Sequence, residues 1–352
     1  MTRIKDNLNP TDESLYRVLA GGVTTINIFH GSVDPIGGQS AVIKMRWGRT
    51  APELLFEGAR PSLKMALKDF GAGAGGRQRK GSENPSSLMG VEAVIRNALR
   101  EAQEYRRTWE DYEKQKAAGV APLLPPRRDL AMEPLAEVLK GERAVHVHTE
   151  HEVRGIVMLM RLAEEFGFRI KTNQHGWSAY MAIPEMKRHG TSVSMFGTFG
   201  NETMYQAAML IRAGVLVSVN SDGEGAARHL NQDAAALMKY GGLTEDEALA
   251  MLTINPAKQL DIDKRVGSIE VGKDADLAIW DHHPLSVYAV ADTVLIDGLP
   301  YFTRERDKAR RAWVEAERKR LSGGGGARTT APADQPAGPA ADEPRTEVNH
   351  VR

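Results

Sequence analysis

Three side chains that can bind a metal ion follow strand-like segments of the sequence. His148 ends the apolar run 144–148, His175 follows the run 169–173, and Asp222 follows the run 216–220. Two imidazoles and a carboxylate suit Zn²⁺, or Mn²⁺, Fe²⁺ or Co²⁺, with one coordination position left for water. Metal-bound water ionises near neutral pH, and Asp222 could take its proton and pass it to a leaving nitrogen. We therefore predict a hydrolytic metal site formed by His148, His175 and Asp222, with Asp222 as the catalytic base.

Each of these residues also has a purely structural interpretation. A histidine at the end of one strand is commonly a hydrogen-bonded core residue, and Asp222 precedes a glycine, as a turn residue would. Their joint occurrence at strand ends favours a site. His146 shares a strand face with His148, because side chains alternate along a strand, but His148 lies nearer the carboxyl end and is the better candidate. The histidines left undecided are His30, His151 and His229.

The elements that must position these residues alternate regularly between strand and helix after residue 144. Repeated strand-then-helix units with apolar strands predict parallel strands covered by helices. Their number and spacing favour a (β/α)₈ barrel over an open sheet, and the active-site residues of such a barrel come from the carboxyl ends of its strands. The predicted strands are 144–148, 169–173, 192–196 and 216–220, and the predicted helices are 153–166, 180–188, 203–213, 231–240 and 244–252.

The rest of the chain is less regular. Before residue 144 the patterns predict helices 10–20, 52–58, 88–117 and 133–140 and strands 23–28 and 41–45, with glycine-marked loops at 31–38 and 71–87. Short strands with turn signals follow, then a charged helix and a segment rich in Gly, Ala and Pro. We predict an N-terminally incomplete hydrolase barrel over 1–265, a small β appendage over 266–302, a C-terminal helix over 303–321 and a disordered tail over 322–352.

The composition excludes several classes of protein. Lys plus Arg and Asp plus Glu both number 46, so the chain lacks the basic surplus of an electrostatic nucleic-acid binder. The absence of cysteine excludes disulfides and thiolate metal sites. No apolar run approaches the ~20 residues that span a bilayer, and the first residues carry no signal-peptide pattern. We expect a small-molecule substrate as the partner, with neither nucleic acid nor membrane; the pattern leaves the compartment and the substrate open.

Several motifs together resemble the amidohydrolase superfamily. They are Asn-Ser-Asp at 220–222, Thr-Ile-Asn-Pro-Ala-Lys at 253–258 and, most specifically, Gly-Ser-Ile-Glu-Val-Gly-Lys-Asp-Ala-Asp-Leu at 267–277. Gly-Val-Thr-Thr at 22–25, His-Thr at 148–149 and Ala-Glu-Glu-Phe-Gly at 163–167 resemble the imidazolonepropionase-like branch of that superfamily. The resemblance covers about residues 15–302.

The resemblance implies a metal-dependent hydrolase of amide, lactam, amidine or related carbon–nitrogen bonds, built on a (β/α)₈ barrel with a small β domain. It implies that His148 and His175 bind one or two divalent ions, most simply Zn²⁺, and that Asp222 is a ligand or the base. In some relatives a carboxylated lysine bridges two metals, and Lys64 is the candidate here. An unmodified Lys64 would be a cation and would repel a metal. In the alternative interpretation, Lys64 extends its ammonium group to solvent or pairs with a carboxylate. Arg228 and His229 are candidate substrate-binding residues, and the segments 71–87 and 197–202 are the candidate specificity loops.

One departure from the family pattern leads to an alternative. The family's His-x-His metal pair should precede residues 22–25, and no histidine lies there. The chain could therefore be a catalytically incompetent barrel or fragment with a binding or partner-subunit role, or a scaffold that binds carbohydrate or peptide. A barrel without its first strand exposes two unpaired strand edges, so we expect poor solubility or homo-oligomerisation.

Overall fold

The computed structural model describes residues 1–32, 34–67, 85, 87–121, 124–149, 153–197 and 203–323. Nearly all of the predicted tail lies outside this range. So do most of the predicted loop 71–87, most of the segment 197–202, and His151.

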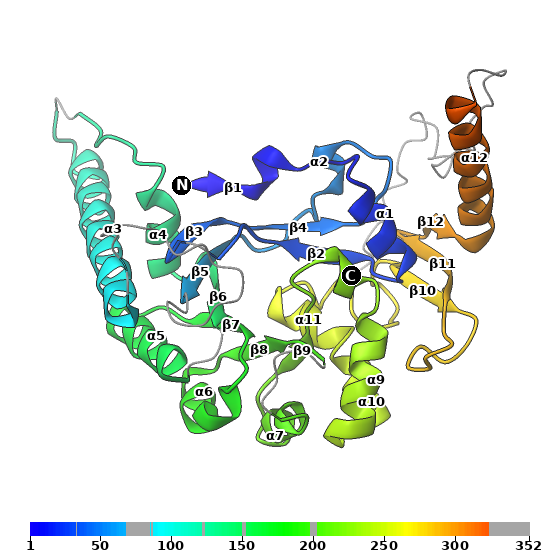
Figure 1. The fold of residues 1–352 in the computed structure, drawn as a ribbon. Helices are drawn as coiled ribbons and strands as arrows, with labels where there is room; N and C mark the ends of the chain where they lie inside the picture. The colour runs from blue at the N-terminus through cyan, green and yellow to red at the C-terminus, as the bar shows by residue number, and fades with distance from the viewer. Residues whose placement is uncertain are drawn as a thin grey trace, which may run out of the picture.

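The central element is a seven-stranded sheet with the strand order β1-β3-β5-β6-β7-β8-β9. From β5 to β9 all neighbours are parallel, whereas β3 runs antiparallel to β5. Parallel neighbours need crossover connections, which the intervening helices provide (Figure 1). The strands are β1 (Thr2–Arg3), β3 (Ile36–Gln39), β5 (Ser62–Leu67), β6 (Ala144–Thr149), β7 (Ile170–His175), β8 (Ser192–Met195) and β9 (Val217–Val219).

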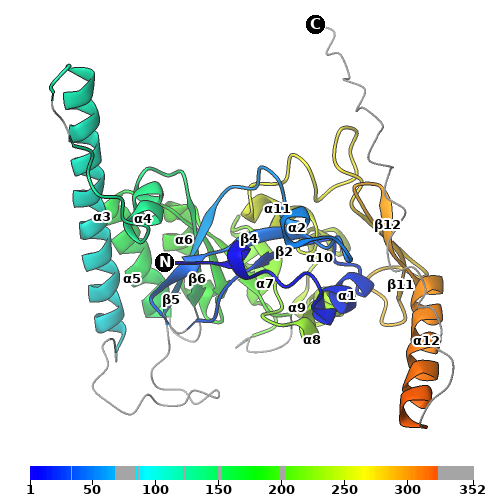
Figure 2. The same ribbon diagram turned by 90° about the horizontal axis from the view of Figure 1, so that it is seen from above.

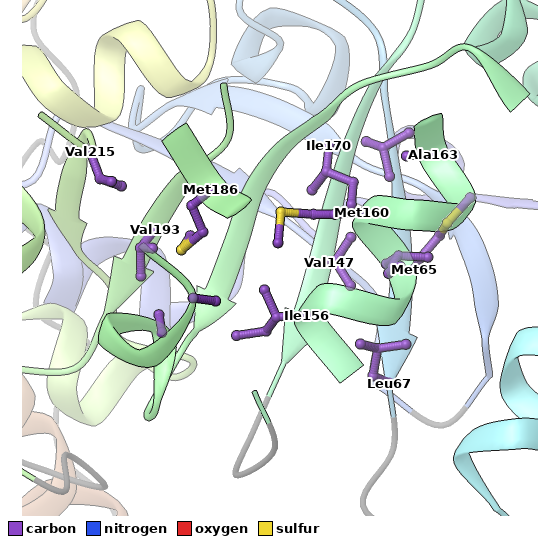
Figure 3. Close-up of a cluster of buried hydrophobic side chains, with 14 of the residues drawn as sticks. Met65, Leu67, Val147, Ile156, Met160, Ala163, Ile170, Met186, Val193 and Val215 are labelled. Atoms are coloured by element: carbon purple, nitrogen blue, oxygen red, sulfur yellow. The ribbon is translucent and has the colours of Figure 1, made fainter. Parts of the chain in front are cut away.

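One face of the parallel strands is apolar and is covered by helices. Met65 and Val147 project from this face and are buried against Ile156 and Met160 of α5 (Figure 3). The helix residues lie on one side of α5 because positions four apart share a helix face. The helices on this side are α3 (Leu88–Ala117), α4 (Met132–Leu139), α5 (Val153–Phe166), η2 (Ala179–Ala182), α6 (Ile183–His189) and α7 (Gln206–Arg212).

The opposite face of the same strands is polar. The register places Lys64 beside His146, and His146 beside Thr172, in one row across the sheet. A second row, nearer the carboxyl ends of the strands, runs from His148 to Gln174 and on to Ser194 and Ser218. Buried polar side chains cost free energy unless they are hydrogen-bonded, so such rows indicate a site rather than a packed core.

A second core joins the N-terminal part of the chain to the C-terminal sheet. The strands β2 (Thr25–Ile28) and β4 (Ala41–Lys44) form an antiparallel pair separate from the main sheet. Leu19 of α1 (Glu13–Ala20), Ile43 and Val294 are fully buried in this core. It also includes residues of the antiparallel sheet β10 (Leu277–Trp280), β11 (Ala291–Ile296) and β12 (Leu299–Thr303). Figure 2 shows α12 (Arg304–Ser322), which follows this sheet, and α3 at opposite ends of the molecule.

A buried lysine ties the two parts of this core together. Lys44 of β4 is fully buried, and its Nζ lies 2.7 Å from Asp274, 3.0 Å from Asp276 and 2.5 Å from Asp297. Burial alone would lower the pKa of Lys44, but the hydrogen bonds to Asp274 and Asp297 outweigh it and raise this pKa. The Gly-Lys-Asp-Ala-Asp segment, the most specific motif of the sequence, therefore holds β4 against the C-terminal sheet.

The predicted mixed α/β class with parallel strands is confirmed. The described strands form an open sheet, with β1 and β9 at its edges. Each of these edge strands has one strand neighbour, as predicted, but the edge of β9 is partly covered: the Asn255 side-chain amide donates to the Val217 carbonyl (2.8 Å), and the Val219 N–H donates to the Met251 carbonyl (3.1 Å). The remaining short helices are η1 (Ile4–Asn7), α2 (Ala51–Leu54), α8 (Glu224–Ala227), α9 (Leu230–Gly241), α10 (Glu245–Ala250) and α11 (Ile254–Gln259).

The prediction of a loop over 31–38 is wrong from residue 36 onward, where β3 begins. The glycines there serve close packing: a Cβ on Gly37 would lie 1.4 Å from the ring of His30, and one on Gly38 would lie 2.4 Å from the Thr2 hydroxyl. None of the described helices has the length and apolar character needed to span a bilayer.

Candidate active site

A cleft of about 1810 Å³ opens at the polar face of the sheet. Its walls come from that face, from β2 and from the segments that follow β9, including α11. Of the residues predicted for the site, His148, His175, Asp222 and Lys64 all line this cleft. The structure therefore brings the predicted metal-binding set to one cavity.

His148 and His175 lie at the ends of neighbouring strands and are in contact. Their ring centroids are 4.5 Å apart and the rings meet edge to face at 74°. Phe196, at the end of the next strand, stacks on the His175 ring at 4.7 Å and 16°. Both imidazoles are buried, at 5% and 3% exposure. The contacts with His148 and Phe196 thus fix the orientation of the His175 ring. The sequence pattern did not predict the contact with Phe196.

Asp222 follows β9 and reaches toward His175. The distance from its Oδ1 to the His175 Nε2 is 3.8 Å, too long for a hydrogen bond, and its side chain is 59% exposed. Both residues have left-handed backbone conformations, with φ of 54° at Asp222 and 70° at His175. Non-glycine residues adopt this region at an energetic cost, and such residues cluster at functional sites. The turns at these two strand ends direct both side chains into the cleft.

Lys64 lies in the deeper polar row and is held by the chain that follows β2. Its Nζ donates hydrogen bonds to the His30 carbonyl (3.0 Å) and the Ser32 hydroxyl (2.8 Å) and lies over the ring of Phe29. Burial lowers the pKa of Lys64, and the Asp222 carboxylate offsets part of that effect. The segment 29–32 thus occupies the ammonium group of the unmodified lysine, and carboxylation of Lys64 stays a prediction.

His146 lies beside Lys64 in the same row and lines the cleft with it. Its ring meets Phe29 edge to face at 5.4 Å. Burial lowers the pKa of His146 to about 4, and nearby Lys171 acts in the same direction. The ring is therefore neutral at physiological pH. The alternation along the strand correctly placed His146 on the same face as His148, and His146 lies deeper in the cleft, further from the carboxyl end of β6.

Arg228 and His229, the predicted substrate-binding residues, lie outside the cleft. Both are exposed, on the connection between α8 and α9, and neither is among the residues that line the cleft. The backbone of Arg228 instead packs on Gly21, where a Cβ would lie 2.6 Å from the Arg228 Cα. Their role in substrate binding stays a prediction.

The donor types of His148, His175 and Asp222 fit a divalent metal. The two rings are in contact, and the carboxylate is near the second ring. In the part of the chain that the structure describes, however, no three His, Cys, Asp or Glu side chains are grouped tightly enough to hold one ion. His148 and His175 are thus a pair that fits a metal, and a bound ion would require either a shift of Asp222 or a further ligand.

Comparison with known proteins places the chain in a family. A sequence profile of the amidohydrolase family matches residues 13–303. Amidohydrolase tasK of Hapsidospora irregularis is 30% identical over 320 residues, which are 84% of this chain and 32% of that protein. An imidazolonepropionase of Shewanella frigidimarina is 62% identical over 39 residues, 11% of this chain and 10% of that protein, in agreement with the predicted branch. This chain thus spans a third or less of the length of these curated relatives.

The solved structures agree. The crystal structure of an amidohydrolase from Thermotoga maritima MSB8 is similar over 86% of this chain and 78% of that chain, at 33% identity and a TM-score of 0.76. The sequence match over most of the chain and this similarity of fold have one explanation: the chain belongs to the amidohydrolase family.

Proposed function

We propose that this chain carries the metal-binding part of a hydrolase that cleaves a carbon–nitrogen bond of a small molecule, such as a non-peptide amide or a cyclic amide. The observation that carries the proposal is the meeting of His148, His175 and Asp222 in one cleft, each at the carboxyl end of a parallel strand. That edge carries the active sites of (β/α)₈ barrels, the architecture that we propose for the complete fold.

His148 and His175 would hold the metal, most simply Zn²⁺. A divalent ion there would supply Lewis-acid polarisation of the scissile carbonyl and water of lowered pKa. The two buried rings are pre-oriented by their mutual contact and by Phe196, so little ordering is left for the binding step. Neutral imidazole is the form that binds a metal, and both rings line the cleft.

Asp222 would act as the general base and then as the general acid. Its exposed carboxylate lines the cleft, 3.8 Å from the His175 ring. It would take one proton from the attacking water and return it to the leaving nitrogen. The left-handed backbone at Asp222 fixes this carboxylate at the strand end.

Lys64 would contribute as a ligand only after carboxylation. Its burial lowers the pKa of the amine, which raises the fraction of neutral amine that can attack CO₂. The hydrogen bonds to the His30 carbonyl and the Ser32 hydroxyl would have to break first. We infer that segment 29–32 must move for Lys64 to be carboxylated.

The test is a hydrolysis screen of the zinc-loaded chain on non-peptide amides, lactams and amidines. Zinc-dependent release of the amine should appear for at least one class. Asp222→Asn should lower the rate by about 10²–10⁴-fold, the usual contribution of a general base. Asp111→Asn, at an exposed position of α3, is the matched control and should keep full activity. Equal rates for the two variants would refute the role of Asp222.

A second candidate is a catalytically incompetent amidohydrolase-like barrel with a binding or partner-subunit role. The observation that favours it is the lack of a three-donor group among the described residues. Small-molecule binding that survives alanine substitution of His148, His175 and Asp222, without hydrolysis of any compound, would favour this candidate over the hydrolase.

A further inference from the structure

The ring of Phe196 holds the His175 imidazole, so the position of Phe196 matters to the site. Phe196 directly follows β8, and its ring lies nearly parallel to the imidazole, with an interplanar angle of 16° and centroids 4.7 Å apart. The strength of an aromatic contact depends on the distance and the angle between the two rings. The contacts of the backbone at the end of β8 therefore decide how the His175 ring is held.

Gly197, the next residue, lies against the backbone of α9. A Cβ at Gly197 would lie 2.2 Å from the Cβ of Asp233 and 2.6 Å from its Cα, closer than the 3.0 Å that real Cβ atoms respect. The φ of Gly197 lies outside the left-handed region, so the close approach requires this glycine and its conformation does not. Because the nearest atoms are the helix backbone and the Cβ attached to it, no side-chain rotation relieves the conflict. A larger residue at 197 would push the end of β8 away from α9.

The helix α9 is itself fixed in the main core. Ala234 and Leu237 are fully buried there, and both lie within the first part of the helix. The Asn231 side-chain amide donates to the Pro284 carbonyl (2.8 Å), which holds the beginning of α9. Protein interiors are close-packed, so a helix seated in this way does not absorb a displacement at its surface. A methyl group added at Gly197 must therefore displace the end of β8 and not the helix.

The far end of α9 supports the beginning of α7 in a similar way. A Cβ at Gly241 would lie 2.4 Å from the Met204 carbonyl oxygen, just before α7. At the other end of α7, the Arg212 guanidinium donates to the Gly242 carbonyl (2.6 Å). The helix α9 also begins in the segment that follows Asp222. One helix thus supports the chain on both sides of the β8–α7 connection and continues the segment that carries the proposed base.

We propose that Gly197 and Phe196 are positioning residues for His175, the proposed metal ligand, and that α9 is the support on which they act. Gly197 brings the backbone at the end of β8 onto α9, and this contact places the Phe196 ring flat on the imidazole. A ligand whose orientation is fixed by packing needs little ordering when the metal binds. The role in metal binding rests on the proposed function, whereas the ring contacts belong to the metal-free chain.

NMR of the metal-free chain with isotope-labelled histidine, phenylalanine and glycine tests the contacts directly. Nuclear Overhauser effects should connect the Phe196 ring to the His175 ring, and the Gly197 α-protons to Asp233. The Phe196 ring should shift the His175 ring protons upfield, because they lie over its face. Phe196→Leu should remove this shift, and Gly197→Ala should reduce it. Gly225→Ala, at an exposed position of α8 where a Cβ meets nothing within 4 Å, is the matched control and should leave the shift unchanged.

Titration with Zn²⁺ then measures the consequence for the proposed metal site. Phe196→Leu and Gly197→Ala should each bind Zn²⁺ about tenfold more weakly than the native chain, the usual loss when a group that orients a metal ligand is removed. Gly225→Ala should bind Zn²⁺ as the native chain does, and circular dichroism checks that each variant folds.

The outcomes separate the positioning role from the proposed function. If the native chain shows the ring contacts and binds no Zn²⁺, the proposed function fails and the contacts stand. The positioning role is overturned if the native Overhauser effects are absent, or if Phe196→Leu or Gly197→Ala keeps the native His175 shift. It is also overturned if the native chain binds Zn²⁺ and both variants bind it equally tightly. Should Gly197→Ala not fold, the native Overhauser effects and Phe196→Leu decide.

Discussion

At the scale of single residues, the floor of the cleft places two basic side chains next to each other in a buried environment. Lys64 and His146 lie side by side, and burial lowers the pKa of each. A neutral imidazole next to a lysine avoids the repulsion that two cations would create in a site of low dielectric. The same arrangement makes folding sensitive to acid.

The first prediction concerns His146 and acid stability. Its pKa is about 4 in the folded chain, against 6.5 for an unperturbed histidine, so below pH 6.5 the unfolded chain binds a proton that the folded chain does not. Stability is therefore lost as the pH falls from 6.5 toward 4. Between pH 7 and pH 5 the native chain should lose about 2 kcal/mol more unfolding free energy than His146→Gln, at 1.36 kcal/mol per pKa unit.

Urea unfolding at the two pH values measures this difference. His283→Gln removes a half-exposed imidazole and should keep the pH dependence of the native chain. Parallel stability curves for the native chain and His146→Gln would contradict the prediction.

The second prediction concerns the packing of the His30 ring against Gly37. A Cβ at Gly37 would lie 1.4 Å from the Cε1 of His30, whereas a Cβ at Gly31 meets nothing within 4 Å. Gly37→Ala should lower the unfolding free energy by about 1–3 kcal/mol, the cost of overpacking, and Gly31→Ala should change it little. Because His30 carries the carbonyl that binds Lys64, Gly37→Ala should also increase the reactivity of Lys64 with trinitrobenzenesulfonate. Equal stabilities of the two variants would show that the ring is not fixed there.

At the scale of elements, β4 is joined to the C-terminal sheet by ion pairs of a lysine, and it does not pair with any strand of that sheet. Lys44 is fully buried among three carboxylates, two of which belong to the motif at 267–277. Removing one partner of a buried ion cluster leaves uncompensated charge, which costs more than the cluster itself contributes.

The third prediction follows from that asymmetry. Lys44→Met should lower the unfolding free energy by about 3–5 kcal/mol, since it leaves Asp276 buried without its cation. Lys187→Met, on the exposed side of α6, is the matched control and should fall within about 0.5 kcal/mol of the native chain. Thermal or urea unfolding of both variants measures the difference, and a Lys44→Met variant as stable as its control would refute the structural role of the motif.

Period and spacing predicted the strands and helices after residue 144 well, because each apolar strand is followed by a helix with one buried face. They also predicted which strand ends carry His148, His175 and Asp222. Period and spacing could not predict β3, because its glycines suggested a loop. In the structure, these glycines allow the close approach of His30 and Thr2. Nor could period and spacing show Phe196 stacked on His175, or Arg228 and His229 outside the cleft, because these follow from tertiary packing.

At the scale of the whole molecule, a sheet with one apolar face and an N-terminal core both contribute residues to the lining of one wide cleft. The fourth prediction is that the chain self-associates, because β1 and β9 lie at the edges of the described sheet and each has only one strand neighbour there. Sedimentation velocity should show species larger than the monomer that grow with concentration. A monomer at all concentrations would contradict this.

The most direct test of the proposed site is calorimetric titration of the purified chain with Zn²⁺. We predict saturable binding by the native chain, binding at least about tenfold weaker in His148→Ala and His175→Ala, and unchanged binding in His283→Gln. Binding to the native chain that is absent, or that is unaffected by substitution of both cleft histidines, would contradict a metal-dependent hydrolytic site at the carboxyl ends of β6 and β7.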